Sequence, residues 1–256
     1  GVFGPGWALG VPGVARKTSK GIPTYDEQED VFILSGAEDL VPVDRPTGAT
    51  TRYRPRTEGL FARIVRHLDA NNDYWYVQSK DGLTSVYGTE ASRGNDPATV
   101  ADPEDRSNVF SWHLTLTRDM YGNRIEYEYK RDTGRDESHT WDQLYLRRIR
   151  YVNYGAPGSG QFLVSVSFSY EDRPDHFSNY GSGFDIRTRK RCTQIAIRTH
   201  ADQERLARTY SFLYLDQVRK QANELPLNGV SLLHQIEVRG HDGERTKSLP
   251  PLEFRY

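Results

Sequence analysis

Short stretches in which apolar and polar residues alternate run through most of this sequence, and they restrict it to strand-rich folds. In 111–117, SWHLTLT, every second residue from Trp112 onward is apolar and the residues between are polar. Residues 125–130, IEYEYK, and 164–170, VSVSFSY, repeat the alternation with tyrosine, valine and phenylalanine. Because successive side chains of a strand point to opposite faces, each stretch predicts a strand with one apolar and one polar face.

Segments that contain glycine, asparagine or aspartate separate these stretches, as in 79–83, SKDGL, 119–124, DMYGNR, and 240–244, GHDGE. Short turns of this composition join antiparallel strands, whereas helical periodicity is scarce. We therefore expect an all-β fold, a large curved antiparallel sheet of hairpins and meanders with little helix. Residues 88–107 are polar and rich in turn formers, and they predict a long exposed loop between two β regions.

Length and composition favour a thin structure. The chain has 256 residues, a length that one β domain can reach, so we expect a single domain over residues 1–256. Hydrophobic residues make up 36%, which is low for this length, and aromatic residues make up 12%, which disordered chains avoid. This combination predicts a folded sheet, shell segment or elongated module rather than a thick globule. The start at Gly1, without methionine or leader, indicates a piece of a longer protein.

Several classes of function are disfavoured by the charge and by the single cysteine. The net charge of −1 argues against a nucleic-acid partner, which would be held by neutralising its phosphates. No apolar run approaches the ~18 residues that a membrane-spanning helix needs, so no membrane span is expected. Cys192 is the only cysteine, so the chain can form neither an internal disulfide nor a cysteine metal site.

The glycine-rich segment 4–21, GPGWALGVPGVARKTSKG, tests a phosphate-binding hypothesis. A phosphate loop needs glycines between a buried strand and a helix, with free backbone N–H donors. This segment contains proline, lacks a following helical pattern, and has neither the G-K-[ST] nor the G-x-G-x-x-G spacing. We therefore interpret it as a structural segment that leads into the sheet and places Trp7 on a sheet edge.

A calcium-binding hypothesis arises in 69–73, DANND, where oxygen ligands stand at alternate positions. An EF-hand loop then requires glycine and a twelfth-position glutamate, but this chain has Tyr74 and Lys80. We expect a hairpin turn around Asn71 and Asn72 instead. The seven histidines are scattered without metal-ligand spacing, so no metal site and no cofactor are predicted.

Three further motifs receive structural interpretations. Glu126 and Glu128 resemble the E-x-E pair of ADP-ribosyltransferases, but the alternation predicts a solvent-facing strand face. Basic neighbours could lower the pKa of Cys192, yet a structural thiol fits its strand position better. The basic stretch 187–191, RTRKR, is expected to form ion pairs rather than to bind nucleic acid. No catalytic residue is predicted, and the chain is not expected to be an enzyme.

The order of motifs along the chain resembles one family. Segment 4–26, GPGWALGVPGVARKTSKGIPTYD, segment 32–43, FILSGAEDLVPV, and the closing 248–256, SLPPLEFRY, are similar to the SpvB-type domain of bacterial virulence proteins. This domain also opens the B subunits of insecticidal Tc toxin complexes. The likeness covers nearly the whole chain, and 117–129, TRDMYGNRIEYEY, looks like one RHS/YD-type repeat.

The resemblance implies a function. In the family, this region and RHS repeats form a β-shell around a toxic C-terminal segment, while the ADP-ribosyltransferase of the Salmonella protein is a separate domain. We therefore expect a secreted, non-catalytic, encapsulating module of a toxin or virulence protein. Its expected partners are other toxin-complex subunits or a downstream RHS or effector part of the same chain.

Two alternatives remain. The chain could be a binding module for a carbohydrate or a protein, with Trp75, Trp112 and Trp141 as partner-contact aromatics, because aromatic rings serve both as binding platforms and as core residues. An ADP-ribosyltransferase that uses Glu126 and Glu128 is the second alternative, and an assay with labelled NAD discriminates it.

Overall fold

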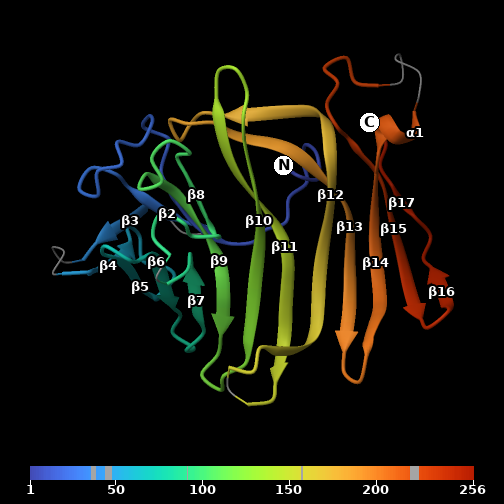
Figure 1. Cartoon of the computed structure of the whole chain (residues 1–256), viewed down its shortest axis with the longest axis horizontal. Helices are drawn as coiled ribbons and strands as arrows, with labels where there is room; N and C mark the ends of the chain where they lie inside the picture. Colours follow the sequence, from blue (N-terminus) through green and yellow to red (C-terminus); the bar gives the residue numbers. More distant parts are fainter. Residues whose placement is uncertain (36–38, 44–47, 91, 157, 220–224) are drawn as a thin grey trace. The chain divides into compact units, whose positions relative to one another are not determined.

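The computed structural model is built almost entirely of strands, with 56% of the residues in strands and 2% in helix (Figure 1). The all-β prediction is therefore confirmed. The structure describes residues 1–35, 39–43, 48–90, 92–156, 158–219 and 225–256. Because its only described helix is the four-residue α1, no helical segment in these ranges is long enough to cross a membrane.

The chain divides into two compact units. We name them the barrel unit, which comprises Val11–Leu146 and Ser178–Arg187, and the sheet unit, which comprises Gly1–Gly10, Arg147–Phe177 and Thr188–Tyr256. Each unit is described by itself below. The expectation of a single domain over residues 1–256 stays a prediction.

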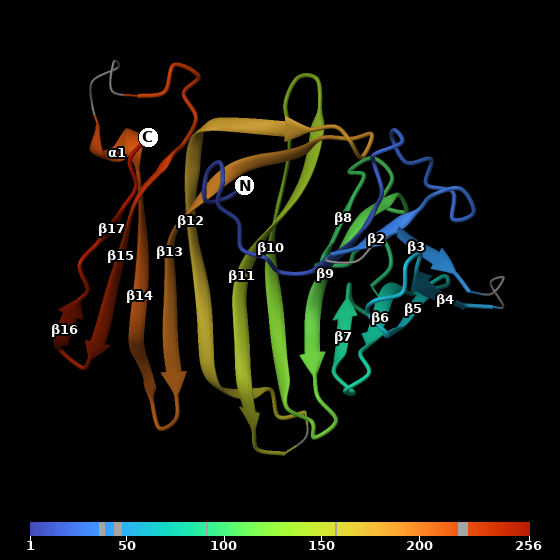
Figure 2. The ribbon, with the colours of Figure 1, turned by 180° about the vertical axis from the view of Figure 1, so that it is seen from behind.

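In the described ranges, the strands of the barrel unit are β1 (Gly13–Arg16), β2 (Phe32–Leu34), β3 (Asp39–Pro42), β4 (Thr50–Pro55), β5 (Arg63–Leu68), β6 (Asp73–Gln78), β7 (Thr84–Tyr87), β8 (Thr99–Ala101), β9 (Val109–Arg118), β10 (Arg124–Arg135) and the first part of β11 (Thr140–Tyr154). Strands β1 to β7 pair antiparallel in chain order, and β7 then pairs with β9. Strand β9 also pairs with β1, with Trp112 opposite Val14, and so closes a ring of eight strands. Figure 2 shows strands β2 to β9 grouped together in this part of the chain.

The interior of this ring holds a dense aromatic cluster. A barrel of eight strands is just wide enough for side chains to fill it, and here Phe32 lies at the centre of the filling. The ring of Phe32 contacts those of Tyr53, Trp75 and Trp112, with centroid separations of 5.9, 5.0 and 5.8 Å. These edge-on contacts are the geometry that aromatic rings prefer, so the cluster fixes the barrel core.

The prediction of a long exposed loop over residues 88–107 is wrong for the middle of that segment. Strand β8 lies within it and pairs with β9, with Thr99 opposite Trp112. Asp96 is also buried, and its carboxylate accepts hydrogen bonds from the backbone N–H groups of Thr89 and Ala98. A strand of three residues is too short to show alternation, which explains why the sequence pattern did not reveal it.

In the described ranges, the sheet unit contains the rest of β11, β12 (Gln161–Asn179), β13 (Ile186–His200), β14 (Glu204–Tyr214), α1 (Leu215–Val218), β15 (Leu233–Asp242), β16 (Arg245–Ser248) and β17 (Leu252–Glu253), with the ends of β12 and β13 assigned to the barrel unit. Antiparallel pairing joins β11 to β12, β13 to β14 and β14 to β15 (Figure 1). Most residues of β13 and β15 are half-buried on both faces of the strand.

The first residues of the chain pack onto the sheet unit. The backbone N–H of Cys192 donates to the carbonyl oxygen of Val2, and the ring of Phe3 meets that of Phe212 edge-on at 5.1 Å. Trp7 packs against Phe254, with a centroid separation of 4.6 Å. Phe254 directly follows β17, so the glycine-rich segment does place Trp7 beside a short pairing strand, as the sequence interpretation expects.

Candidate functional site

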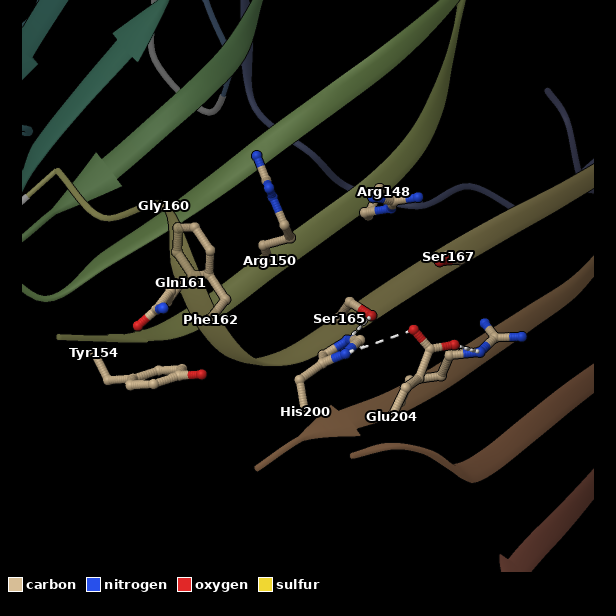
Figure 3. A pocket seen from close by; sticks show the side chains of 11 residues that line it. Arg148, Arg150, Tyr154, Gly160, Gln161, Phe162, Ser165, Ser167, His200 and Glu204 are labelled. Carbon is tan, nitrogen blue, oxygen red and sulfur yellow. Dashed lines mark hydrogen bonds and ion pairs between the residues drawn. The ribbon is translucent and has the colours of Figure 1, made fainter. Parts of the chain in front are cut away.

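A polar cavity of about 420 Å³ opens on one face of the sheet unit (Figure 3). Two of its walls come from β11 and β12. Arg148 lies opposite Ser167 in the strand register, and Arg150 lies opposite Ser165. Because residues two apart share a face of a strand, the two arginines and the two serines form adjacent rows that point into the same space.

The other wall comes from the hairpin of β13 and β14. The Oγ atom of Ser165 lies 2.7 Å from Nε2 of His200, so these side chains share a hydrogen bond. The Nδ1 atom of His200 lies 3.6 Å from a carboxylate oxygen of Glu204, which is its register partner on β14. Glu204 also pairs with Arg198, whose Nε lies 3.2 Å from the carboxylate.

The cavity exists because a strand with small side chains lies between two strands with long side chains. Serines occupy the middle strand β12, while arginines and a histidine project from the strands on either side. The rim is completed by four residues near the ends of β11 and β12, namely Tyr154, Gly160, Gln161 and Phe162. The guanidinium of Arg150 lies 5.1 Å from the centre of the Phe162 ring, a cation–π contact that holds this arginine at the wall.

The row Ser165, His200 and Glu204 has the order of a nucleophile, a base and a carboxylate. Acyl transfer also needs donors aimed at the developing oxyanion, commonly backbone N–H groups. Ser165 stands within a strand that pairs on both sides, so the N–H groups next to it belong to the ladders with β11 and β13. The geometry therefore suits holding a polar ligand better than attacking one.

The sequence-based expectation for the serine row is wrong at Ser165. Alternation predicts that the serines face water or a lumen and that Val164, Val166 and Phe168 pack. Ser169 is exposed and Phe168 is buried, whereas the two valines are half-buried. Ser165 is nevertheless only 6% exposed, because His200 of the neighbouring strand covers it. A long polar side chain on the next strand buries a small one, and strand periodicity alone carries no information about that neighbour.

The three tryptophans predicted as partner contacts are all buried. Trp75 and Trp112 are 0% exposed inside the barrel, and Trp141 is 7% exposed. The guanidinium of Arg187 lies 4.5 Å from the centre of the Trp141 ring and covers it. The prediction of a tryptophan contact surface is therefore wrong for this structure. Alternation shows which residues share a face, but not that the Trp112 face becomes the inside of a closed barrel.

The acidic pair and the cysteine occupy strand positions. Glu126 and Glu128 are half-buried on β10, and the carboxylate of Glu126 lies 3.3 Å from Nε of Arg124. Cys192 is 0% exposed, and burial raises the pKa of its thiol to about 12. Such a thiol stays protonated at neutral pH, so the structural interpretation of Cys192 is confirmed and the hypothesis of a lowered pKa is wrong.

The basic stretch 187–191 forms ion pairs, as predicted. Arg187 pairs with Asp136 at 2.6 Å, and Lys190 pairs with Asp172 at 2.8 Å. Arg191 is nearly buried and contacts Glu171 and Asp216, with N–O distances of 2.7 Å to each.

The predicted hairpin turn at Asn71 and Asn72 is also confirmed. Strands β5 and β6 pair on either side of it, with Leu68 opposite Asp73. The carboxylate of Asp69 accepts hydrogen bonds from the backbone N–H groups of Asn71 and Asn72, at 2.7 and 2.9 Å. This carboxylate therefore serves as the acceptor that stabilises the turn.

A closed eight-stranded barrel and a long-stranded antiparallel sheet together define an all-β module. Residues 1–200 match the family described as Salmonella virulence plasmid 65kDa B protein, SpvB, and the chain belongs to this family. The resemblance seen in the sequence is thus confirmed.

Two named proteins of Salmonella are similar to this chain. The chain is 26% identical to the Mono(ADP-ribosyl)transferase SpvB of Salmonella typhimurium and to that of Salmonella dublin, over 80% of this chain and 43% of each relative. It therefore spans less than half the length of these curated relatives.

Solved structures share the fold. The whole chain is similar to 15% of a chain in the crystal structure of TcdB2-TccC3, with 25% identity and a TM-score of 0.80. It is similar to 14% of a chain of the Photorhabdus luminescens Tc holotoxin pore, with 26% identity and a TM-score of 0.81. The N-terminal domain of SpvB from Salmonella typhimurium strain LT2 has a TM-score of 0.79 at 22% identity, over 94% of this chain and 90% of that domain.

Proposed function

We propose that this chain is a non-catalytic structural β module of a secreted bacterial toxin or virulence protein, which helps to house or present a toxic segment that follows it. The observation that carries the proposal is the character of the sheet unit. Its strands are 10 to 19 residues long from β12 to β15, and most residues of β13 and β15 are half-buried on both faces. A sheet with two accessible faces suits a wall.

The comparisons support this function. Chains whose structures bear the names of Tc toxin components contain this fold as a small part of a much longer polypeptide. The SpvB N-terminal domain is a separate structure of nearly the same extent as this chain. The partners we propose are other toxin-complex subunits or a downstream RHS or effector part of the same polypeptide, and the location we propose is outside the producing cell.

The geometry of the candidate residues supports a non-catalytic role. Cys192 is buried with a raised pKa, and Ser165 lies in a strand whose N–H groups belong to sheet ladders. Glu126 and Glu128 stand on one strand of a continuous pairing with their side chains half-buried. We therefore propose that the ADP-ribosyltransferase activity named in the Salmonella relatives belongs to the part of those proteins that this chain does not match.

The housing role is tested by protease protection. This chain is produced together with the polypeptide that its gene encodes after Tyr256, and trypsin digestion is followed by mass spectrometry. We expect the downstream polypeptide to survive at least about ten times longer with this chain than without it. Equal digestion rates would contradict the proposal.

The non-catalytic role is tested separately with labelled NAD. We expect this chain to transfer no ADP-ribose to a bacterial or host lysate, and the Glu128→Gln variant to give the same background signal. Labelling by the unaltered chain that disappears in the Glu128→Gln variant would show that the module is an enzyme.

A further inference from the structure

We propose that the cavity formed by β11, β12 and β13 in the sheet unit is a binding site for a small oxyanion, that is, a phosphate, sulfate or carboxylate group of a small molecule. Arg148, Arg150, Ser165 and Ser167 form its centre, and His200 closes one side. Figure 3 shows Ser165 between Arg150 and His200. This inference does not depend on the housing role proposed above.

The charge of the lining residues selects an anion. Three arginines line the cavity, Arg148, Arg150 and Arg198, and Glu204 is the one carboxylate among the described lining residues. That carboxylate already contacts Arg198 at 3.2 Å. The guanidinium group stays charged at all ordinary pH values, and its planar set of donors matches the oxygens of carboxylate and phosphate. A cationic ligand would be repelled from the same space.

The register of the strands places each arginine side chain directly across from a serine hydroxyl. Arg150 and Ser165 are directly opposed, and so are Arg148 and Ser167, so each arginine has a hydroxyl beside it. Directly opposed residues of an antiparallel pair have Cβ atoms about 4.5–5.5 Å apart. An oxyanion between the two rows can therefore accept from the guanidinium of Arg148 and the hydroxyl of Ser167 together, and from the hydroxyl of Ser165 when Nε2 of His200 is the donor of their hydrogen bond. A lone surface arginine lacks this set of donors.

The hydrogen bond between Ser165 and His200 fixes the inner hydroxyl. Its length is 2.7 Å, and Ser165 is only 6% exposed, so the serine side chain is held in a fixed position in the cavity wall. A preorganised polar group costs less conformational entropy when a ligand binds than a mobile one. The small serine side chain also keeps the cavity open, because a larger residue at this position of β12 would fill it.

The size of the cavity fits a small molecule. Its volume of about 420 Å³ falls in the range of about 300–1,000 Å³ that is usual for small-molecule sites. The chain as a whole has a net charge of −1, so a general attraction for polyanions such as nucleic acid is absent. The positive character belongs to this cavity and not to the protein surface in general.

The test is isothermal titration calorimetry of the chain with sodium sulfate, sodium phosphate and sodium citrate, in a buffer of low ionic strength. We expect saturable binding of at least one of these anions. Arg148→Gln should weaken that binding by at least about tenfold, and Ser165→Ala should weaken it by about three- to tenfold. Binding of sulfate and phosphate identifies an inorganic or phosphate-ester ligand, whereas binding of citrate alone identifies a carboxylate.

The matched control is Arg147→Gln. Arg147 precedes Arg148 on β11, is exposed, and is not among the described residues that line the cavity. This variant removes the same charge from the same strand, so we expect a change in affinity of less than about twofold, with circular dichroism confirming that each variant is folded. Absence of saturable binding for all three anions, or equal weakening by Arg147→Gln and Arg148→Gln, would overturn the proposal.

Discussion

The barrel unit and the sheet unit use similar alternating strands with opposite results for burial. In the barrel unit, closure of the ring turns one face of each strand inward, and Trp75 and Trp112 become fully buried. In the sheet unit, β13 and β15 keep most residues half-buried on both faces. The comparison teaches that alternation specifies a two-faced strand, while long-range pairing decides whether either face becomes an interior.

The two units also differ in how they hold charge. Inside the barrel, Arg66 is 2% exposed and its Nε lies 2.9 Å from the carboxylate of Asp73. The guanidinium of Arg66 also lies 4.7 Å from the centre of the Trp112 ring. On β15 of the sheet unit, by contrast, the pair of Arg239 and Glu237 is open to solvent. Exposed pairs contribute little, whereas breaking a buried pair leaves a charge without its partner in a poor solvent for ions.

The largest effect that we expect from this comparison concerns Trp75. Replacing Trp75 with alanine empties the centre of the barrel and should lower the free energy of unfolding by about 3–5 kcal/mol. Phe177→Ala in the sheet unit removes a ring that is 44% exposed and should cost less than about 1 kcal/mol. Urea unfolding followed by circular dichroism measures both. Similar losses for the two variants would break the contrast between the units.

A second prediction compares the ion pairs. A double-mutant cycle with Arg66→Met and Asp73→Asn should give a coupling free energy of about 2–3 kcal/mol, because both charges are buried. The same cycle with Arg239→Gln and Glu237→Gln should give less than about 1 kcal/mol. The couplings come from urea unfolding of the four variants of each cycle. A larger coupling on β15 than in the barrel would show that burial does not control these pairs.

The smallest expected effect is a loss of folding stability at acidic pH. Burial, followed by the charge of Arg131, lowers the pKa of His113 on β9 to about 4. Histidine in the unfolded chain has a pKa of about 6.5, so the unfolded state takes up the proton first. The associated stability is complete above about pH 6.5 and is lost as the pH falls toward about 4, by roughly 1–3 kcal/mol.

The variant His113→Gln tests this sign. Its free energy of unfolding should depend less on pH between 7 and 4.5 than that of the unaltered chain, as measured by tryptophan fluorescence in urea at several pH values. Fluorescence reports mainly on the barrel unit, because three of the four tryptophans lie there. If the free energy of unfolding depends on pH in the same way in both proteins, the pKa of His113 does not differ between the folded and unfolded states.

Local sequence pattern predicted several of the strands and turns but not their assembly. The alternation from Trp112 onward predicted β9, and the asparagine pair at 71–72 predicted the hairpin of β5 and β6. Pairing of β1 with β9 joins Gly13 to His113, and no local periodicity reports on such a distant partner. The inward direction of the tryptophans depends on that closure, so it could not be predicted from the pattern.

The cavity was missed for a related reason. The sequence analysis identified the serine row on β12 as one face of an alternating strand, but it did not single out the arginines of β11. Their opposition depends on the register of Arg150 with Ser165, and His200 reaches Ser165 from a third strand. A useful signal was the RIR spacing of Arg148 and Arg150 close to a run of alternating serines, because facing rows of large and small polar residues leave space between strands.

The closing strand β9 also has a consequence for synthesis of the protein on the ribosome. Gly13 of β1 pairs with His113, so the last seam of the barrel forms only after about 100 further residues have been translated. At the usual elongation rate of about 5–20 residues per second, this wait is roughly 5–20 s. The hairpins from β2 to β7 need only near neighbours and can form in the meantime. A pause in translation before Val109 therefore leaves an open barrel whose aromatic side chains are accessible to chaperones and proteases.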